Sequence, residues 1–435
     1  MTGQFRLRLI VLLAAAWLMP VAKSELRIDI TEGAGQAVPI AVVPFGWEGS
    51  GAPSTDVSGL VAADLIRTGR FAPIPETDML EFPTTGAEVD FGDWRILGIV
   101  YVIVGRLSET GPDSYMIQFQ LFDVFRGEQL LGYRLPSTSA ALRASAHRVS
   151  DMIYEKLTGV PGIAGTRIAY VNVLGKSDAE IFRLIVSDSD GENARVMLES
   201  ADPILSPAWS PDGRKLAYVS FERGHSEIYV QVLRTGARQR VSARSGVNSA
   251  PAWSPDGRIL ALTLSKTDGN LDIYTLDLSN QVLGRLTDNP AIDTEPSWSA
   301  DGRWIFFTSD RSGGPQIYKI SVNGGRAQRQ TFEGNYNARP RVSPDDQSIA
   351  VVHNDRGNFR IAVLDVARAY LQVLTDGHLD ESPSFAPNGE TLIYATREGG
   401  RGLLAAVSID GRIRQRISSV EGDVREPAWS PFPLN

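Results

Sequence analysis

The chain has 435 residues, no cysteine and a formal charge of −8. This length allows two domains, and the lack of cysteine excludes disulfides and thiolate metal sites. The acidic balance argues against a protein that binds the phosphate backbone of nucleic acids.

The first 24 residues have the pattern of a secretory signal. Arg6 and Arg8 precede an apolar run at residues 9–19, and small side chains follow at the two positions that a signal peptidase inspects. The apolar run falls well short of the roughly 20 residues that span a bilayer, so we favour cleavage after Ser24 over a membrane anchor. Cleavage also removes Lys23 and changes the formal charge to −11, and no second segment is apolar enough to span.

The mature chain then begins with an alternating segment: Glu25, Leu26, Arg27, Ile28, Asp29, Ile30, Thr31 and Glu32. Such alternation predicts a half-exposed strand. The plainer interpretation, which the pattern alone favours, is an edge strand of the domain that follows. The other is a free, extended N-terminus that adds itself to the sheet edge of another protein.

Residues 25–165 predict a small α/β domain. Buried strands are expected at residues 38–43 and 99–104, and a half-buried strand at residues 115–121. No catalytic motif stands out in this part of the chain.

Two amphipathic helices are predicted in the same domain. The first is capped by Ser54, Thr55 or Asp56 and ends at Gly69. Its apolar face consists of Val57, Leu60, Val61 and Leu65. The second ends at Gly159, and its apolar face consists of Leu142, Ala146, Val149, Ile153 and Leu157.

From residue 207 onwards, a motif of the form Pro-x-Trp-Ser-Pro-Asp-Gly recurs with substitutions, and its last copy is cut short. Its leading prolines are Pro207, Pro251, Pro296, Pro340, Pro383 and Pro427. They are 44, 45, 44, 43 and 44 residues apart, which is the length of one β-propeller blade. The Ser-Pro-Asp-Gly part suits a tight turn, and the strands that follow are apolar on both faces, as a blade between two neighbours requires. Val342 and Phe385 replace Trp in two copies, so this core position accepts any large apolar side chain.

The two ends of the array give the number of blades. The first two-sided strand, at residues 167–172, has no Pro-x-Trp-Ser strand before it, and the last motif, at residues 427–431, stands alone. Half a blade at each end makes one whole blade. Residues 166–435 therefore predict a six-bladed β-propeller closed by the C-terminal strand, within a mainly β protein.

Polar residues recur immediately before each inner strand. Because inner strands run along the ring axis, these residues should surround one mouth of the channel. The set includes Asn248, Ala250, Asp293, Thr294, Glu295, Asn337, Arg339, Asp380, Glu381, Arg425 and Glu426. As a group they are the expected place for a ligand, a cation or a partner loop. Taken singly, capping of strands and hydrogen bonding to neighbouring blades explain them equally well.

No catalytic set is found. The chain has no Gly-x-Ser-x-Gly elbow, and none of His147, His225, His353 and His378 has a tight metal-ligand spacing to another. We interpret each histidine as structural or solvated. We therefore predict no catalytic, cofactor-binding or metal-binding residue, and leave open a cation in the channel.

Several segments together resemble the TolB family, the periplasmic propeller component of the Tol-Pal system of Gram-negative bacteria. They are the signal, the strand ELRIDI at residues 25–30, PIAVVPF at 39–45, VAAD at 61–64, EKLTG at 155–159, RIAY at 167–170 and the terminal PAWSP at 427–431. The similarity covers essentially the whole chain. The repeat alone is shared by many secreted propellers, but its combination with this N-terminal domain is specific.

The resemblance implies a periplasmic adaptor without catalysis, acting in envelope integrity and in outer-membrane constriction during cell division. The mouth residues named above would bind the lipoprotein Pal, and residues 25–32 would be recognised by TolA. We expect a monomer with no membrane span after signal cleavage. Other outer-membrane partners and a part in bacteriocin transport rest on family analogy alone. Val247 departs from the family, which often has a polar residue, commonly His, at this position.

Two other classes of protein remain open. One is a secreted propeller hydrolase or lyase that uses mouth carboxylates such as Glu295 and Glu381, although no carboxylate spacing or base supports it. The other is a binding protein for small ligands or glycans, which would need aromatic side chains at the mouth. Tyr336 is the obvious candidate there.

Overall fold

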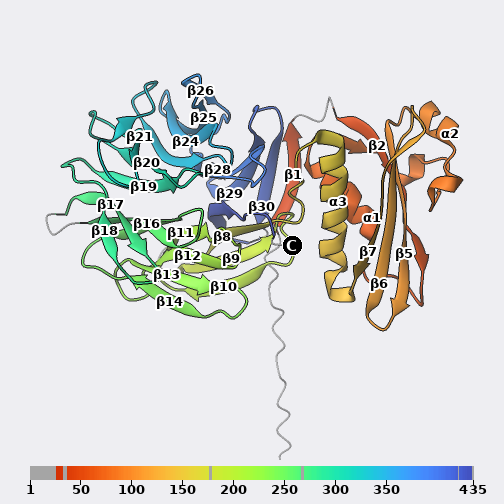
Figure 1. The fold of residues 1–435 in the computed structure, drawn as a ribbon, viewed down its shortest axis with the longest axis horizontal. Helices are drawn as coiled ribbons and strands as arrows, with labels where there is room; N and C mark the ends of the chain where they lie inside the picture. Colours follow the sequence, from red (N-terminus) through yellow and green to blue (C-terminus); the bar gives the residue numbers. More distant parts are fainter. Residues whose placement is uncertain (1–25, 33–36, 176–178, 266–268, 420, 434–435) are drawn as a thin grey trace, which may run out of the picture.

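The computed structural model describes residues 26–32, 37–175, 179–265, 269–419 and 421–433. An α/β domain and a propeller lie side by side along the long axis of the molecule (Figure 1). The predicted signal at residues 1–24 and Glu25 lie outside the described residues.

The α/β domain is built on one sheet with the strand order β4-β2-β5-β6-β7, and β3 also pairs with β5. Its strands are β2 Val38–Val42, β3 Gly46–Glu48, β4 Phe71–Pro73, β5 Tyr101–Gly111, β6 Ser114–Asp123 and β7 Glu128–Ser137. Its helices are α1 Val57–Arg67, α2 Phe91–Ile96 and α3 Leu142–Thr158. Single 3-10 turns lie at Glu76–Asp78, Gly86–Glu88 and Ser139–Ala141.

Both faces of this sheet are covered, because its central strands are apolar throughout. Ile40 and Ile103 pack under α1 and α3, while Val43 and Val102 pack against Trp94 of α2. The two long helices have the predicted ends. The carboxylate of Asp56 accepts a hydrogen bond from the amide of Gly59 at the start of α1, whereas α3 ends at Gly159, which has a φ of 78°.

Within the described residues, the rest of the chain forms six antiparallel sheets, which we number as blades one to six along the chain. Blade one contains β8 Arg167–Leu174, β9 Ile181–Asp188 and β10 Arg195–Ser200. Blade two contains β11 Ile204–Trp209, β12 Lys215–Ser220, β13 Glu227–Val232 and β14 Arg238–Ser242. Blade three contains β15 Asn248–Trp253, β16 Ile259–Ser265, β17 Leu271–Asp277 and β18 Leu283–Arg285. Blade four contains β19 Asp293–Trp298, β20 Trp304–Ser309, β21 Gln316–Ser321 and β22 Gln328–Arg329. Blade five contains β23 Asn337–Val342, β24 Ser348–Asp355, β25 Asn358–Asp365 and β26 Tyr370–Val373. Blade six contains β27 Glu381–Phe385, β28 Thr391–Glu398, β29 Arg401–Ser408 and β30 Arg414–Ser419.

The last strand, β31 Asp423–Trp429, pairs with β8 and is the innermost strand of blade one. The ring thus closes between the two ends of the propeller sequence, as half a blade at each end predicts. The predicted fold class, a six-bladed propeller with an N-terminal α/β domain, is confirmed.

The inner strands share one irregularity, a bulge at the residue before the repeat proline. This residue has a positive φ in all six blades: Ser206 51°, Ala250 48°, Glu295 56°, Arg339 54°, Ser382 55° and Glu426 52°. The strand register shifts at the same place in each blade. A bulge bends its strand and turns one side chain away from the regular alternation. Equivalent residues of different blades can thus meet at the ring axis.

The repeat tryptophans fasten neighbouring blades together. The indole N–H groups of Trp209, Trp253 and Trp298 donate hydrogen bonds of 2.9, 3.1 and 3.1 Å to the carbonyl oxygens of Ala428, Ala208 and Ala252, each in the preceding blade. Val342 and Phe385 have no such donor. The repeat position therefore does more than fill the core, because Trp also satisfies a carbonyl of the adjacent inner strand.

Trp253→Phe should lower the free energy of unfolding by about 1 kcal/mol more than the same change at a tryptophan without this bond, because one part-buried hydrogen bond is lost while an aromatic ring remains. Trp304→Phe is the matched control, since the described residues give the Trp304 indole N–H no hydrogen-bond partner. Urea denaturation of both variants measures the difference. Equal destabilisation would show that the bond to Ala208 contributes nothing.

Candidate functional site

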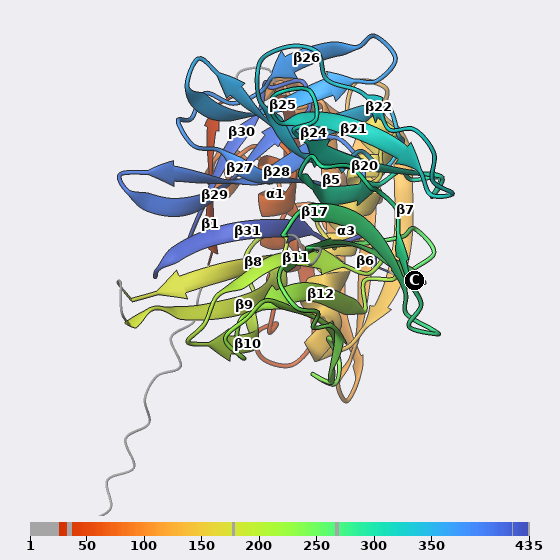
Figure 2. The same ribbon diagram turned by 90° about the vertical axis from the view of Figure 1, so that its left-hand side faces the viewer.

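The candidate site is the channel mouth where the inner strands begin. The α/β domain contacts the opposite end of an inner strand. Asn388, in the turn after β27, donates to the carbonyl of Pro161, and Glu390 binds Arg70 at 3.0 Å and Tyr154 at 2.9 Å. The mouth therefore faces away from the α/β domain. Figure 2 views the propeller with this domain behind it.

Four of the predicted mouth residues are buried, and their polar atoms are used within the fold. They occupy the third position before the repeat proline: Asn248 0%, Asp293 0%, Asn337 0% and Asp380 1% exposed. Each joins the start of an inner strand to a neighbouring loop or strand. A partner protein cannot reach these side chains without opening the blade, so their direct role is to hold the mouth in shape.

The bonds of these residues show how this is done. Asn248 Oδ1 accepts from Ser242 Oγ at 2.7 Å, and Asp293 accepts two bonds of 2.8 Å from Arg311. Thr375 and Thr396 donate to Asp380 at 2.5 and 2.6 Å.

Asn337 completes this group and also explains one histidine. Its Oδ1 lies 2.9 Å from Nδ1 of His353, and its Nδ2 donates to Gln316 Oε1 at 3.0 Å. Burial lowers the pKa of His353. The structural interpretation of this histidine agrees with these contacts.

Two residues further along the inner strands, charged residues from different blades meet across the channel. Arg339 of blade five donates from Nε to Glu295 Oε1 of blade four at 2.8 Å, and its Nη1 lies 3.4 Å from Glu426 Oε1 of blade one. The same Nη1 contacts Ser382 Oγ of blade six. The backbone N–H of Arg339 also donates to Glu295 and to Thr308, both at 3.0 Å. Four blades are thereby tied to one guanidinium.

This group places one positive charge, that of Arg339, between two carboxylates. Burial disfavours the charged form of Arg339, but Glu426 and Glu295 outweigh it and raise the pKa of the guanidinium. Arg339 thus offsets one of the two carboxylate charges at this point of the channel. Sequence spacing placed all three residues at the mouth, but it could not show that they pair with one another.

The accessible part of the mouth includes an apolar rim that the sequence analysis did not recognise. Val247 and Ile292, four residues before their repeat prolines, are 39% and 47% exposed, and Leu205 is 37% exposed. Tyr336 occupies the same position as Val247 in its own blade, but its ring packs edge-on against Phe359 with centroids 5.1 Å apart. The sequence did carry a signal for this rim, because the fourth residue before the repeat proline is apolar in the neighbouring blades three and four.

The other predicted mouth residues lie beside this rim. Thr294, Glu381 and Arg425 are half-buried, and so is Ala250. Arg425 Nη2 lies 3.5 Å from Asp423. The exposed rim is therefore apolar on blades two to four, at Leu205, Val247 and Ile292, whereas blades six and one carry the half-buried charges of Glu381 and Arg425.

The N-terminal strand β1 Leu26–Glu32 belongs to the propeller and not to the α/β sheet. It pairs antiparallel with β30 as a fifth strand of blade six, with Leu26 opposite Ser419 and Ile28 opposite Ile417. The interpretation of residues 25–32 as an edge strand of the α/β domain is therefore wrong. An alternating segment needs only an open edge, and its pattern does not specify which sheet provides that edge.

The position of β1 makes it part of the boundary between the domains. In Figure 1 the strand lies between β30 and the helices α1 and α3. A cavity of about 1210 Å³ beside it is lined by residues of both domains, including Tyr154, Glu390, Ile413 and Gln415.

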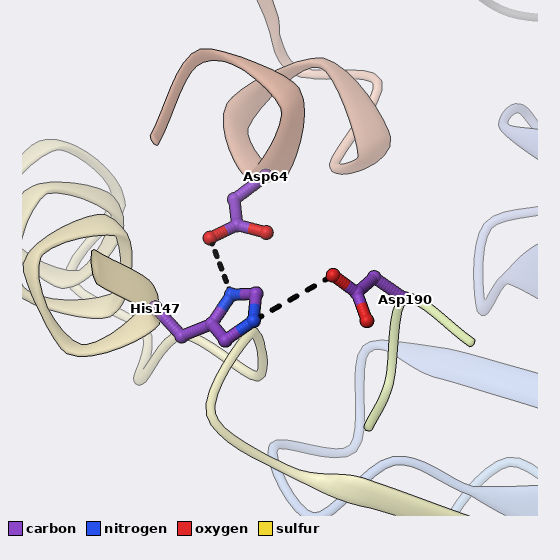
Figure 3. A group of neighbouring side chains, drawn as sticks. All are labelled: Asp64, His147 and Asp190. Carbon is purple, nitrogen blue, oxygen red and sulfur yellow. Dashed lines mark hydrogen bonds and ion pairs between the residues drawn. The ribbon is translucent and has the colours of Figure 1, made fainter. Parts of the chain in front are cut away.

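A second group of polar side chains lies at this domain boundary, namely Asp64, His147 and Asp190 (Figure 3). Their arrangement does not suit a metal ion, because the two ring nitrogens of His147 face different carboxylates. Arg67 contacts Asp64 and Arg143 contacts Asp190, so arginine already neutralises both acids. Ser150 donates to Asp64 rather than to His147, which also excludes a serine nucleophile activated by this histidine.

Two family models match the chain, the TolB amino-terminal domain at residues 26–130 and the TolB beta propeller domain at residues 154–433. A Tol-Pal system protein TolB of Xanthomonas euvesicatoria pv. vesicatoria is 50% identical over 424 residues, covering 96% of each chain. Another, of Xanthomonas oryzae pv. oryzae, is 52% identical over 410 residues, covering 94% of this chain and 93% of the relative. The crystal structure of TolB from Acinetobacter baumannii superposes with a TM-score of 0.88 at 42% identity, covering 94% of this chain and all of the other.

No helix of the described residues has the length and apolar character needed to cross a bilayer.

Arg339→Gln should lower the free energy of unfolding by about 2 kcal/mol, because it leaves Glu295 and Glu426 without a counter-charge in a partly buried site. Combining it with Glu295→Gln should restore part of the loss. Urea denaturation of the single and double variants gives the coupling energy. Simple additivity of the two single losses would contradict a pairing that matters for stability.

Proposed function

Because this chain belongs to the TolB family and is a component of the Tol-Pal system, we propose that it is a non-enzymatic periplasmic adaptor. The propeller mouth binds the outer-membrane lipoprotein Pal, and the N-terminal strand binds TolA. This links the protein to envelope integrity and to outer-membrane constriction in division. Further partners, including other outer-membrane proteins and bacteriocins, would use the same surfaces.

The observation that carries the Pal assignment is the combination of a fixed channel with an accessible rim. The Arg339 group ties four blades together, so the mouth is held in one shape before a partner arrives. Val247 and Ile292 offer apolar surface beside the small side chain of Ala250. Apolar surface surrounded by polar residues is the usual composition of a protein-binding site. The charges of Glu381 and Arg425 at the other side would select the partner and its orientation.

The TolA assignment rests on how β1 is attached. The antiparallel pairing with β30 occupies the backbone groups along one edge of β1, and these are groups that the strand could offer to another protein's sheet. Docking on β30 and binding to a partner through that edge therefore exclude each other. A partner that binds the mouth shifts this balance if its affinity differs between the two states of the strand.

The rival enzymatic function finds little support at the mouth. Glu295 and Glu426 are both paired with Arg339, so neither carboxylate is free to serve as an acid or a base. A glycan site would need an exposed aromatic face, whereas Tyr336 packs on Phe359. The adaptor is thus the function that the arrangement supports best.

Val247→Arg should weaken Pal binding by about tenfold or more, because a long charged side chain replaces apolar contact surface at the mouth. Calorimetric titration of residues 25–435 with the soluble domain of the same organism's Pal measures the affinity. Val282→Arg is the matched control, since Val282 is 61% exposed and lies next to β18, the outer strand of blade three. Unchanged affinity of Val247→Arg, or an equal loss with Val282→Arg, would refute the mouth as the Pal site.

Deletion of residues 25–32 should abolish TolA binding and spare Pal binding, because the deletion leaves all six inner strands intact. Titration of the deleted protein with the periplasmic part of TolA and with Pal tests both statements. Retained TolA binding would disprove the role of the strand. Loss of both partners in a folded protein would show that the strand is structural instead.

A further inference from the structure

A buried cluster of charged side chains joins the α/β domain to the propeller. His147 of α3 lies between Asp64 of α1 and Asp190, which follows β9 at the turn towards β10 (Figure 3). Nδ1 of His147 is 2.8 Å from Asp64 Oδ2, and Nε2 is 3.6 Å from Asp190 Oδ2. The three side chains are 2–3% exposed. Asp190 is the only one of the three that the propeller contributes, so the contact from Nε2 crosses the domain boundary.

The protonation state of His147 decides the sign of this contact. A neutral imidazole has one N–H, and the short distance to Asp64 assigns that N–H to Nδ1. Nε2 then presents a lone pair to a carboxylate oxygen, and in this arrangement it has no hydrogen-bond partner. Protonation makes both ring nitrogens donors and converts the second contact from repulsion to attraction.

Arginines of the α/β domain and carboxylates of both domains surround His147. On α1, Arg67 contacts Asp64 and lies 3.6 Å from Asp190. On α3, Arg143 contacts Asp190 and lies 3.7 Å from Asp188 of β9.

The acid completing this environment is Asp151 on α3, which accepts hydrogen bonds of 2.7 and 2.9 Å from the amides of Ala164 and Gly165, in the segment leading to the propeller. Two arginines thus face four carboxylates. The cluster has a surplus of negative charge that an imidazolium reduces.

We propose that His147 is a proton-operated clamp, in which the imidazolium holds the α/β domain on the propeller through Asp190 and loss of the proton loosens this joint. The clamp is a property of the chain by itself and needs no partner. Other contacts across the boundary, such as Asn388 with Pro161, do not involve this proton. Deprotonation therefore widens the range of domain orientations without separating the domains.

The direction of the pH dependence follows from two groups. Burial disfavours the charge on His147, but the hydrogen bond to Asp64 and the charges of Asp64 and Asp190 outweigh it and raise its pKa above 6.5. The stability that protonated His147 adds to the folded protein is complete below pH 6.5 and is lost as the pH rises through the raised pKa. Burial raises the pKa of Asp151 from 3.8 to about 6, so its contribution is also lost on raising the pH, between 3.8 and about 6. The pKa of Asp64 is lowered, despite its burial, by His147 and Arg67. The stability that its ionised carboxylate contributes is therefore lost only in stronger acid.

The test measures the distance between the domains by spin labelling. The chain has no cysteine, so Glu128→Cys and Arg234→Cys, both at exposed positions, place one label on each domain. Distance distributions of the full mature protein are recorded at about pH 5.5 and about pH 8.5, on either side of the histidine range. We expect a narrow distribution at the lower pH and a broader or shifted one at the higher pH. Identical distributions at both pH values would overturn the proposal.

Variants identify the responsible group. His147→Gln should give the broad distribution at both pH values, and Asp190→Asn should also remove the pH dependence while keeping the shape of the side chain. His225→Gln is the matched control, because His225 also lies beside a carboxylate, Glu227 at 3.1 Å, but is 54% exposed on blade two. The distance distribution of this variant should respond to pH as that of the wild type does. A pH response that survives in both His147→Gln and Asp190→Asn, or disappears in His225→Gln, would assign the effect to another group.

Discussion

The closure of the ring is the constraint on which the rest of this structure depends. Each blade buries its two faces against its neighbours, so a propeller that stays open would expose the apolar strands of its first and last blades to water. In this chain the strand that closes the ring comes from the opposite end of the propeller sequence, where β31 pairs with β8. The Trp bonds between successive inner strands and the Arg339 group across the axis then act on a ring whose diameter is already set.

The periodic part of this architecture could be read from the sequence because each repeat carries its own local signals. The proline spacing, the turn residues and the two-sided apolar strands belong to single blades, and the half-blade at each end follows by counting. The caps of α1 and α3 are likewise local, since Asp56 and Gly159 act on their own helix ends.

What the sequence could not supply depends on contacts between distant segments. Residues such as Asn248 and Asp293 looked like mouth residues, and their burial became visible only when the loops of their blades were in place. Glu295, Arg339 and Glu426 come from blades four, five and one, and blade one is adjacent to neither of the others, so no spacing rule brings the three residues together. For β1, an alternating strand fits any open edge, and β30 provided one that the sequence pattern does not identify.

The closing strand also dictates the order in which the propeller can form. Trp429 of β31 donates a hydrogen bond to Thr166, 263 residues earlier in the chain. Until synthesis reaches these last residues, blade one lacks its innermost strand and the ring has two unsealed sides. Such a chain cannot complete its cooperative core while it emerges, because the strand that closes the ring is the last strand in the sequence. This topology therefore postpones the closed, fully packed ring until the final strand of the chain is available.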